Sequence, residues 1–307
     1  MNIALDMTGG DFAPLEAVKG VQLFFSQSWE QVHLILIGDE QVIEPLLSDY
    51  NIPGEHISIV HASQVIGMHE HPTKALKEKQ QSSIAIGFQL LAAGKADAFI
   101  SAGNTGAMMV GALFSIKAIE GVLRPAIGAY LPKETGDLSL LVDVGLNADC
   151  KPENLCQFAL LGSLFAKYIL NISNPRVGLI NLGAEEGKGN LLTQAAYPAL
   201  KENKRINFIG NVEGRDLLAD QCDIYVCDGF TGNVILKLAE SIYDIVKRRN
   251  IDDEYFNRFN FEIYGGVPVL GVNKPVIIGH GISHAKAFEN MILIAKKMHE
   301  EGLTDKI

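Results

Sequence analysis

Residues 98–107 read Ala-Phe-Ile-Ser-Ala-Gly-Asn-Thr-Gly-Ala, an apolar run followed by a turn of glycine and small polar residues. The run predicts a short strand over 98–100, and a helical pattern of small residues continues over 105–119. The same order of apolar strand, turn and helix recurs along the 307 residues. Such alternation predicts an α/β fold in which helices cover both faces of a mainly parallel sheet.

Most of the other expected strands are also continuously apolar, as strands buried on both faces are. They cover 3–5, 32–37, 56–60, 140–142, 177–180, 206–209, 224–226 and 276–278. Further helices are expected over 14–27, 83–93, 153–170, 191–200, 233–248 and 283–299, the last with Ser283 as its N-cap. No linker or low-complexity tract interrupts this pattern. We therefore expect a three-layer, Rossmann-like sandwich and a single α/β domain over residues 1–307, with room for two lobes.

The composition narrows the class of protein. Hydrophobic residues make up 48% of the chain, charged residues 20%, and the formal net charge is -10. An acidic balance disfavours nucleic acid as a partner. The four cysteines form no C-x-x-C pair, and the first residues show neither a signal peptide nor a membrane-spanning run. We expect a cytoplasmic protein with reduced thiols.

Four turns after expected strands are rich in glycine and small polar residues: 6–11, 101–107, 183–190 and 228–233. A helix N-terminus leaves backbone N–H groups unpaired, and glycine lets an anion approach them closely. One such turn is ordinarily a capped, tightly packed helix start. Four of them at the carboxyl ends of strands, where α/β sheets bind ligands, predict a site for a small anion such as phosphate.

Common cofactor and metal motifs are missing or incomplete. The first half has no G-x-G-x-x-G fingerprint, and the loop 183–189 has one residue too few for a P-loop. His69-Glu70-His71 lacks an evident third ligand, and Gly281 and the Ser283 cap disfavour a helix that would place His280 and His284 on one face. No G-x-S-x-G nucleophile elbow is present. We expect no cofactor, no metal and no covalent nucleophile.

Seven motifs in a fixed order resemble one family along nearly the whole chain. They are Asp6 to Asp11, Ser101 to Ala107, Asp143 to Pro152, Gly178 to Asn190, Gly210 to Asp216, Asp228 to Asn233 and Tyr264 to Asn273. The chain resembles the PlsX-type phosphate acyltransferases of bacterial phospholipid synthesis. The resemblance implies a homodimeric enzyme that shares its fold with isocitrate dehydrogenases and phosphotransacetylases.

The activity that this resemblance implies is reversible acyl transfer from acyl-[acyl carrier protein] to inorganic phosphate. The product, acyl phosphate, would pass to a membrane glycerol-3-phosphate acyltransferase. Attack of phosphate on a thioester needs a bound phosphate and donors for the oxyanion. A thiolate with a pKa of about 8.5 leaves without a strong general acid.

We assign roles to nine residues on this basis. Lys188 is expected to neutralise phosphate or polarise the carbonyl, and Asn233 to donate to the oxyanion. Phosphate or substrate binding is expected of Asp6, Gly9, Gly10, Ser101, Gly103, Asn104 and Thr105.

The sequence departs from the family pattern in two places. The opening motif is Asp-Met-Thr-Gly-Gly-Asp instead of Asp-Ala-Met-Gly-Gly-Asp. The stretch 240–263 is short and mixed in charge, whereas many members carry a longer, apolar and basic membrane-contacting segment here, so peripheral membrane contact stays open. An acidic carrier protein would need a local basic patch on this acidic chain. One candidate is Lys247 to Arg249 with Arg258, and the other is Lys201, Lys204 and Arg205.

Three alternatives remain open at this stage. The first is a phosphotransacetylase-like transferase that uses acyl-CoA. The second is a dehydrogenase of the related fold, since such relatives bind nucleotide without the common fingerprint. The third is a non-catalytic module that binds acyl carrier protein, although a scaffold has no need of four polar strand-end turns.

Overall fold

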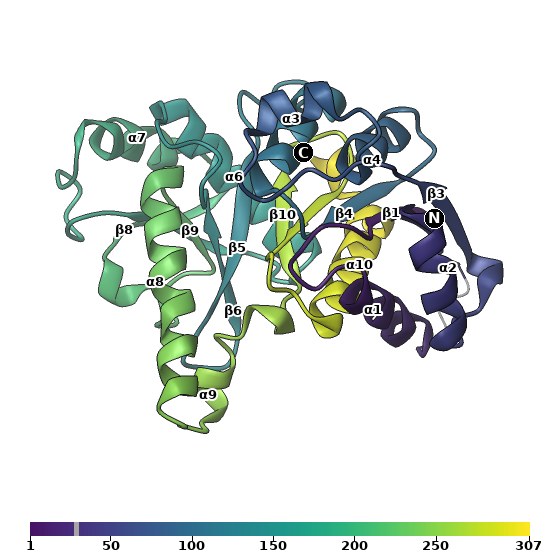
Figure 1. Cartoon of the computed structure of the whole chain (residues 1–307). Helices are drawn as coiled ribbons and strands as arrows, with labels where there is room; N and C mark the ends of the chain where they lie inside the picture. Colours follow the sequence, from purple (N-terminus) through teal and green to yellow (C-terminus); the bar gives the residue numbers. More distant parts are fainter. Residues whose placement is uncertain (28–30) are drawn as a thin grey trace. The chain divides into compact units, whose positions relative to one another are not determined.

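The computed structural model describes residues 1–27 and 31–307 of the chain. These residues form two compact units. Unit 1 comprises residues 1–118 and 262–304, and unit 2 comprises residues 119–261 and 305–307. Each unit contains strands with helices packed on them (Figure 1). That the two are lobes of one domain stays a prediction.

Among the described residues, unit 1 contains six strands, most of them parallel to their neighbours. Its strands are hydrogen-bonded in the order β3-β2-β1-β4-β11-β10. In the part of unit 1 that the structure describes, β10 is antiparallel to its neighbour β11, and the pairs from β3 to β11 are parallel. Their bounds are β1 (Asn2–Asp6), β2 (His33–Gly38), β3 (Ile57–His61), β4 (Ala98–Ser101), β10 (Gly266–Leu270) and β11 (Val276–Gly279). The central strands β1 and β4 are almost entirely buried, because helices cover them on both faces.

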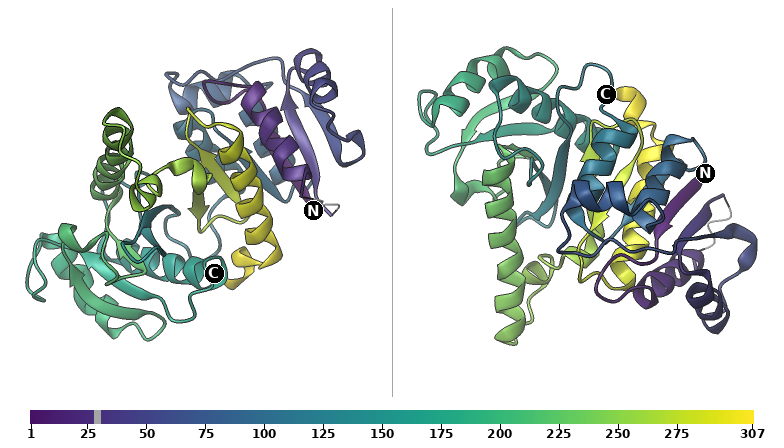
Figure 2. Two further views of the ribbon diagram at one scale, coloured as in Figure 1. Left: turned by 90° about the horizontal axis from the view of Figure 1, so that it is seen from below. Right: turned by 45° about the horizontal axis from the view of Figure 1, so that its top comes forward.

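The helices of unit 1 pack on this sheet in two groups. Helices α1 (Leu15–Phe25) and α10 (Ala285–Glu300) lie side by side (Figures 1 and 2), and α10 also packs on β4 and β11. Helix α4 (Ser83–Ala92) packs on β1, β2 and β4 and against α5 (Thr105–Gly111), which continues as a π-helical turn over Ala112–Ile116. Helices α2 (Glu40–Asp49) and α3 (Pro72–Glu78) complete the set, and the short α11 (Leu303–Lys306) has residues in both units.

Unit 2 repeats the arrangement with five strands, in the order β5-β6-β9-β7-β8. Strand β5 is antiparallel to β6, and the remaining neighbours are parallel. The strands are β5 (Ala126–Pro132), β6 (Leu138–Val142), β7 (Arg176–Ile180), β8 (Asn207–Val212) and β9 (Ile224–Val226). Helix α6 (Pro152–Tyr168) packs on β6, β9 and β7 and against α7 (Leu191–Glu202), and α8 (Gly229–Arg248) contacts β6 and α9 (Glu254–Asn257).

An ion-pair network fixes one end of the unit 2 sheet. The ammonium of Lys133, only 2% exposed, donates to Asp223 at 2.6 Å and to Asp220 at 2.9 Å. The guanidinium of Arg176 also donates to both carboxylates. Burial alone would raise the pKa of Asp223, but the hydrogen bonds from Arg176 and Lys133 lower it to about 2. The carboxylate is therefore a charged, stabilising part of the folded unit at neutral pH.

The expected α/β class with a mainly parallel sheet is confirmed, and the differences have local causes. Strands β5 and β10 were not expected, because each contains a glycine and a proline, residues that are atypical of strands. Helix α2 was not expected either, since Pro45 lies inside it. Both unexpected strands are the antiparallel ones.

Two helix starts also differ from the prediction. Helix α8 begins at Gly229 instead of residue 233, because Asp228 caps it by accepting from the backbone N–H of Thr231. Helix α10 has His284 at its N-cap position, so Ser283 as the cap is wrong. The hydroxyl of Ser283 is buried without a hydrogen-bond partner among the described residues.

Candidate active site

In unit 1, one buried carboxylate joins the turns that follow the neighbouring strands β1 and β4. Asp6 is fully buried, and its Oδ1 accepts from the backbone N–H of Thr8 at 2.9 Å and of Gly9 at 3.1 Å. Its Oδ2 accepts from the hydroxyl of Ser101 at 2.6 Å. The Ser101 oxygen in turn accepts from the N–H of Gly103 at 2.9 Å. Four of the predicted site residues therefore form one hydrogen-bonded hub. Its central bond joins Asp6 and Ser101, which are 95 positions apart in the chain.

Glycine is required where these turns touch. A Cβ on Gly9 would lie 2.5 Å from both Asp6 Oδ2 and the backbone nitrogen of Gly103, closer than any real Cβ approaches such atoms. Gly10 has a φ of +101°, which favours glycine. Its neighbour along the chain, Asp11, donates its N–H to the carbonyl of Gly281. The turns after β1, β4 and β11 thus meet at one edge of the unit 1 sheet.

Asn104 holds a further loop against the start of α5. Its Oδ1 caps the helix by accepting from the N–H of Ala107, and its Nδ2 donates to the carbonyls of Gly67, Met68 and Glu70. The residue is 4% exposed. A contact between phosphate and the side chains of Asn104 or Ser101 would replace bonds that they already make. Thr105, the first residue of α5, is exposed.

In unit 2, a second buried carboxylate organises the turn after β6. Asp143 accepts from the N–H of Ile127 at 2.8 Å and of Asn147 at 2.6 Å. Burial raises its pKa, although these hydrogen bonds oppose the rise. Sequence reasoning gave Asp143 and Asn147 no role of their own. The available signal was a lone acidic residue directly after an apolar strand, the arrangement that Asp6 also shows.

Helix α8 starts in direct contact with this turn. A Cβ on Gly229 would lie 2.8 Å from Asp143 Oδ2, and one on Gly232 would overlap the Asp143 carbonyl. Asn233 follows one residue later and is exposed. Its side chain lies beside Gly145, whose φ is +130° and whose added Cβ would be 3.7 Å from the Asn233 amide. The helix start therefore presents the Asn233 amide over the turn that follows β6.

Lys188 lies in the loop between β7 and α7, and the backbone of this loop is held at several points. Its own carbonyl accepts from Asn181 Nδ2, and the Nε2 of Gln194 donates to the carbonyls of Gly187 and Gly189. Asn211 Nδ2 donates to the carbonyl of Glu185. The Lys188 side chain is exposed and has no carboxylate partner among residues 1–27 and 31–307. The loop thus presents a free ammonium from a fixed backbone.

Lys188 and Asn233 come from the same edge of the unit 2 sheet. Their segments follow β7 and β9, which are hydrogen-bonded neighbours, and the Asp143 turn follows β6 on the other side of β9. Because these three strands are parallel, their carboxyl ends lie at one edge. The structure thus groups the predicted residues into one set on unit 1 and one on unit 2.

The thiols do not supply a nucleophile to either set. Burial raises the pKa of all four cysteines, to about 11 for Cys150, to about 12 for Cys222 and well above the ordinary value for Cys227. A raised pKa keeps a thiol protonated and unreactive at neutral pH. In the part of the chain that the structure describes, no cluster of three or more His, Cys, Asp or Glu could hold a metal ion.

The two basic patches differ in how free their charges are. Lys247, Arg248 and Arg249 are exposed at the end of α8, whereas Arg258 is half-buried and donates to the carbonyl of Gly136. In the second patch, Lys201 is paired with Glu186 at 2.9 Å. No helix of the described residues is long and apolar enough to cross a membrane.

The chain is similar to known acyltransferases over its whole length. The family model described as "Fatty acid synthesis protein" matches residues 1–306. A phosphate acyltransferase from Dictyoglomus turgidum is 43% identical, over 100% of this chain and 96% of the relative. One from Halothermothrix orenii is 44% identical, over 97% of this chain and 94% of the relative.

A solved structure shares the fold at low sequence identity. It is a phosphotransacetylase from Streptococcus pyogenes, with a TM-score of 0.69 and 17% identity, over 98% of this chain and 94% of that one. The expected likeness to the phosphotransacetylase fold is therefore confirmed.

Proposed function

Because the chain belongs to the PlsX-type phosphate acyltransferase family, which transfers acyl groups to phosphate, we propose a specific reaction for it. A fatty acyl group moves reversibly from acyl-[acyl carrier protein] to inorganic phosphate. A phosphate oxygen attacks the thioester carbonyl, the C–S bond breaks, and the carrier leaves as its thiolate. The product is an acyl phosphate for phospholipid synthesis.

The free polar side chains of unit 2 carry this proposal. Lys188 and Asn233 are exposed, follow neighbouring parallel strands and lie on segments with a fixed backbone. An ammonium and an amide N–H are the donors that a phosphate nucleophile and a thioester oxyanion need. We assign Lys188 to phosphate or the carbonyl and Asn233 to the oxyanion. The raised pKa values of the thiols support direct attack by phosphate over a covalent cysteine intermediate.

The expected site residues of unit 1 supply shape and a helix start. Thr105 and the first backbone N–H groups of α5 bind phosphate. Gly9, where a Cβ has no room, and Gly10, whose φ favours glycine, form a close wall. Asp6, Ser101, Gly103 and Asn104 act as positioning residues, because their polar atoms bind each other and the adjoining loops.

The proposed partners follow from the reaction. Acyl carrier protein is the acyl donor. Its better docking candidate is the group Lys247, Arg248 and Arg249, because all three side chains are exposed, whereas Lys201 in the other patch is paired with Glu186. We propose a homodimer that works in the cytoplasm, with contact at the membrane when a glycerol-3-phosphate acyltransferase takes up the acyl phosphate.

A second candidate is a transferase that uses acyl-CoA. The observation that favours it is the shared fold with a phosphotransacetylase. Both candidates attack a thioester with phosphate, so the same residues serve either. They differ in the group that carries the thiol.

Release of free thiol from dodecanoyl-[acyl carrier protein] tests the proposal, measured with and without inorganic phosphate and with dodecanoyl-CoA in parallel. We expect phosphate-dependent release from the carrier protein and little from the CoA ester. Preference for the CoA ester would support the second candidate. No release from either by a folded protein would favour a module that binds the carrier without catalysis.

A further inference from the structure

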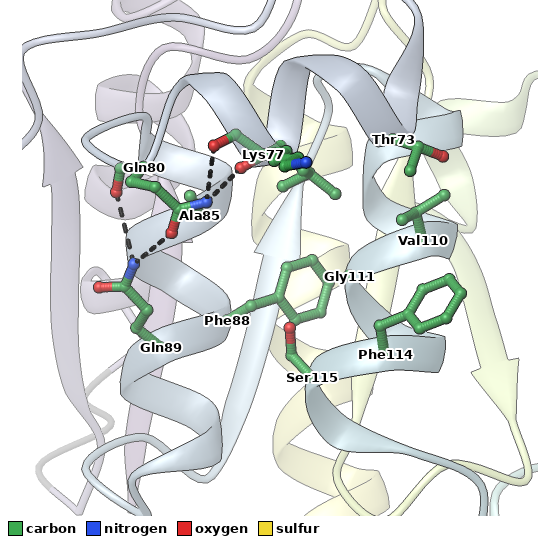
Figure 3. Close-up of a pocket in the computed structure, with 11 residues that line it drawn as sticks. Thr73, Lys77, Gln80, Ala85, Phe88, Gln89, Val110, Gly111, Phe114 and Ser115 are labelled. Atoms are coloured by element: carbon green, nitrogen blue, oxygen red, sulfur yellow. Dashed lines mark hydrogen bonds between the residues drawn. The ribbon is translucent and has the colours of Figure 1, made fainter.

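A groove of about 300 Å³ lies in unit 1, between α3, α4 and α5 with its π-helical continuation (Figure 3). The volume is at the lower end of the range of about 300–1,000 Å³ for small-molecule sites. Apolar residues contributed by all four segments form most of its wall. They are Leu76, Ala85, Phe88, Val110, Gly111 and Phe114.

The floor of the groove is rigid and apolar. The Phe88 ring is 1% exposed and packs edge-on against Phe99, with ring centroids 5.0 Å apart. On the other side, a Cβ on Gly111 would overlap the Phe88 ring, so the glycine lets α5 approach it. Phe88 points from α4 into the space between the helices (Figure 3). A ligand on this floor would meet carbon atoms that the surrounding packing holds in place.

The polar groups at the rim largely satisfy each other. Gln80 Nε2 donates to the carbonyls of Leu76 and Lys77, and Gln89 Nε2 donates to the carbonyl and side-chain oxygens of Gln80 (Figure 3). These amides therefore need no ligand to complete their hydrogen bonds. The unsatisfied surface is the apolar one, above all the Phe114 ring, which is 75% exposed. Phe114 thus adds exposed apolar surface beside the concave apolar floor.

The groove continues from the proposed phosphate site along one helix face. Gly106, next to Thr105, touches Pro72 at the start of α3 so closely that a Cβ would overlap it. Val110 and Phe114 follow Gly106 at spacings of four residues, which places them in the same row. Five residues of helix from Thr105 to Val110 advance about 7.5 Å. A molecule with its polar head at Thr105 can therefore extend its tail into the groove.

Resting on the proposed function, we propose that this groove binds the alkyl chain of the acyl substrate. The head group lies at the start of α5, and the chain runs along the Val110 and Phe114 row over the Phe88 floor. The small volume favours chains of medium length, because longer ones would extend past the Gln80 and Gln89 pair into solvent.

The test is calorimetric titration with n-alkyl phosphates, butyl, octyl and dodecyl, each below its micellar concentration. Burial of each methylene group is expected to improve Kd about fourfold until the groove is filled. Phe114→Asp should raise the Kd of dodecyl phosphate at least tenfold and leave the Kd of butyl phosphate unchanged. Ser115→Trp, which fills the groove from an exposed position, should do the same. Val42→Asp on α2 replaces another exposed apolar residue and is the matched control.

Three results would overturn the proposal: no binding of dodecyl phosphate by the unaltered protein, equal binding by Phe114→Asp, or a Phe114→Asp variant that changes the oligomeric state. The last would make the groove an interface between copies. Thiol release from butyryl and dodecanoyl carrier protein is measured separately. Absence of release with both would contradict the proposed function, while the titration would still decide whether the groove binds alkyl chains.

Discussion

The strand-end turns of the two units use similar residues in opposite ways. In unit 1 the polar side chains of Asp6, Ser101 and Asn104 are no more than 4% exposed and bind each other or nearby backbone. In unit 2 a buried acidic residue, Asp143, also organises a turn, but Lys188 and Asn233, on segments at the same edge of the sheet, are exposed. The polar side chains of unit 1 thus hold its turns in place, whereas two side-chain donors of unit 2 are free to bind a ligand. Substitutions in the first set should affect folding, and those in the second should affect turnover.

The largest effect is expected at Asp6. Asp6→Ala removes the acceptor of four donors: the N–H and the hydroxyl of Thr8, the buried N–H of Gly9 and the buried hydroxyl of Ser101. Unsatisfied buried donors should lower the free energy of unfolding by about 3–5 kcal/mol. Chemical denaturation measures this, with Asp11→Ala, an exposed carboxylate five residues away, as the control. A loss below about 1 kcal/mol would mean that the hub does not hold the two turns together.

Lys188 should show the opposite behaviour. Lys188→Ala is expected to lower kcat about 100- to 1,000-fold, the usual cost of losing one donor to a developing charge. Because the side chain is exposed, the free energy of unfolding should stay the same. Lys201→Ala, on the following helix and paired with Glu186, is the control. A Lys188→Ala variant with unchanged kcat would remove this residue from the site.

The stability of unit 2 should fall in acid because of Asp223. Its pKa is about 2 in the folded protein, below the ordinary value of 3.8. Because the pKa is lower in the folded than in the unfolded protein, the ionised carboxylate stabilises the fold at a pH above the unfolded value. This contribution to the free energy of unfolding is lost as the pH falls towards the folded value, by about 2 kcal/mol between pH 4 and pH 2. Denaturation of the unaltered protein and of Asp223→Asn at each pH measures this. The variant should be less stable at pH 7 and lack this part of the acid loss; an identical pH slope would contradict the assignment.

Thr105 is the exception in unit 1, because its side chain is exposed. Thr105→Val is expected to raise KM for phosphate about tenfold, the loss of one hydrogen bond to a charged ligand, with little change in the free energy of unfolding. Thr105→Ser keeps the hydroxyl and should restore KM. If both variants behave like the unaltered protein, the helix start of α5 does not contact phosphate through this side chain.

The sequence was informative about the parallel strands and about where polar turns follow them. Continuous apolar runs identified β1, β4 and β9, because strands covered on both faces need them. The antiparallel β5 and β10 escaped detection, since Pro132 and Pro268 lie in them and proline is atypical of strands.

The division of labour within the site could not be predicted in the same way. Ser101 looked like a phosphate donor, and only the fold shows that its hydroxyl donates to Asp6, 95 residues away. Asn104 likewise binds a loop more than 30 residues earlier in the chain. From the sequence alone, a polar side chain whose hydrogen-bond partner lies far away in the chain cannot be told from one that has no partner. The roles of Lys188 and Asn233 stay predictions, and the exposure of both side chains is what those roles require.

The Asp6 hub also has a consequence for the rate at which backbone hydrogens exchange with solvent. Backbone amide hydrogens in turns ordinarily exchange fast, because their hydrogen bonds open without disturbing the strands. Here the N–H groups of Thr8, Gly9 and Gly103 are held by Asp6 and by Ser101, which is itself bound to Asp6. The first two share one carboxylate oxygen, and the third is held by a hydroxyl that binds the other oxygen of the same carboxylate. They should therefore exchange slowly and at one shared rate, so that two turns distant in sequence report a single opening event.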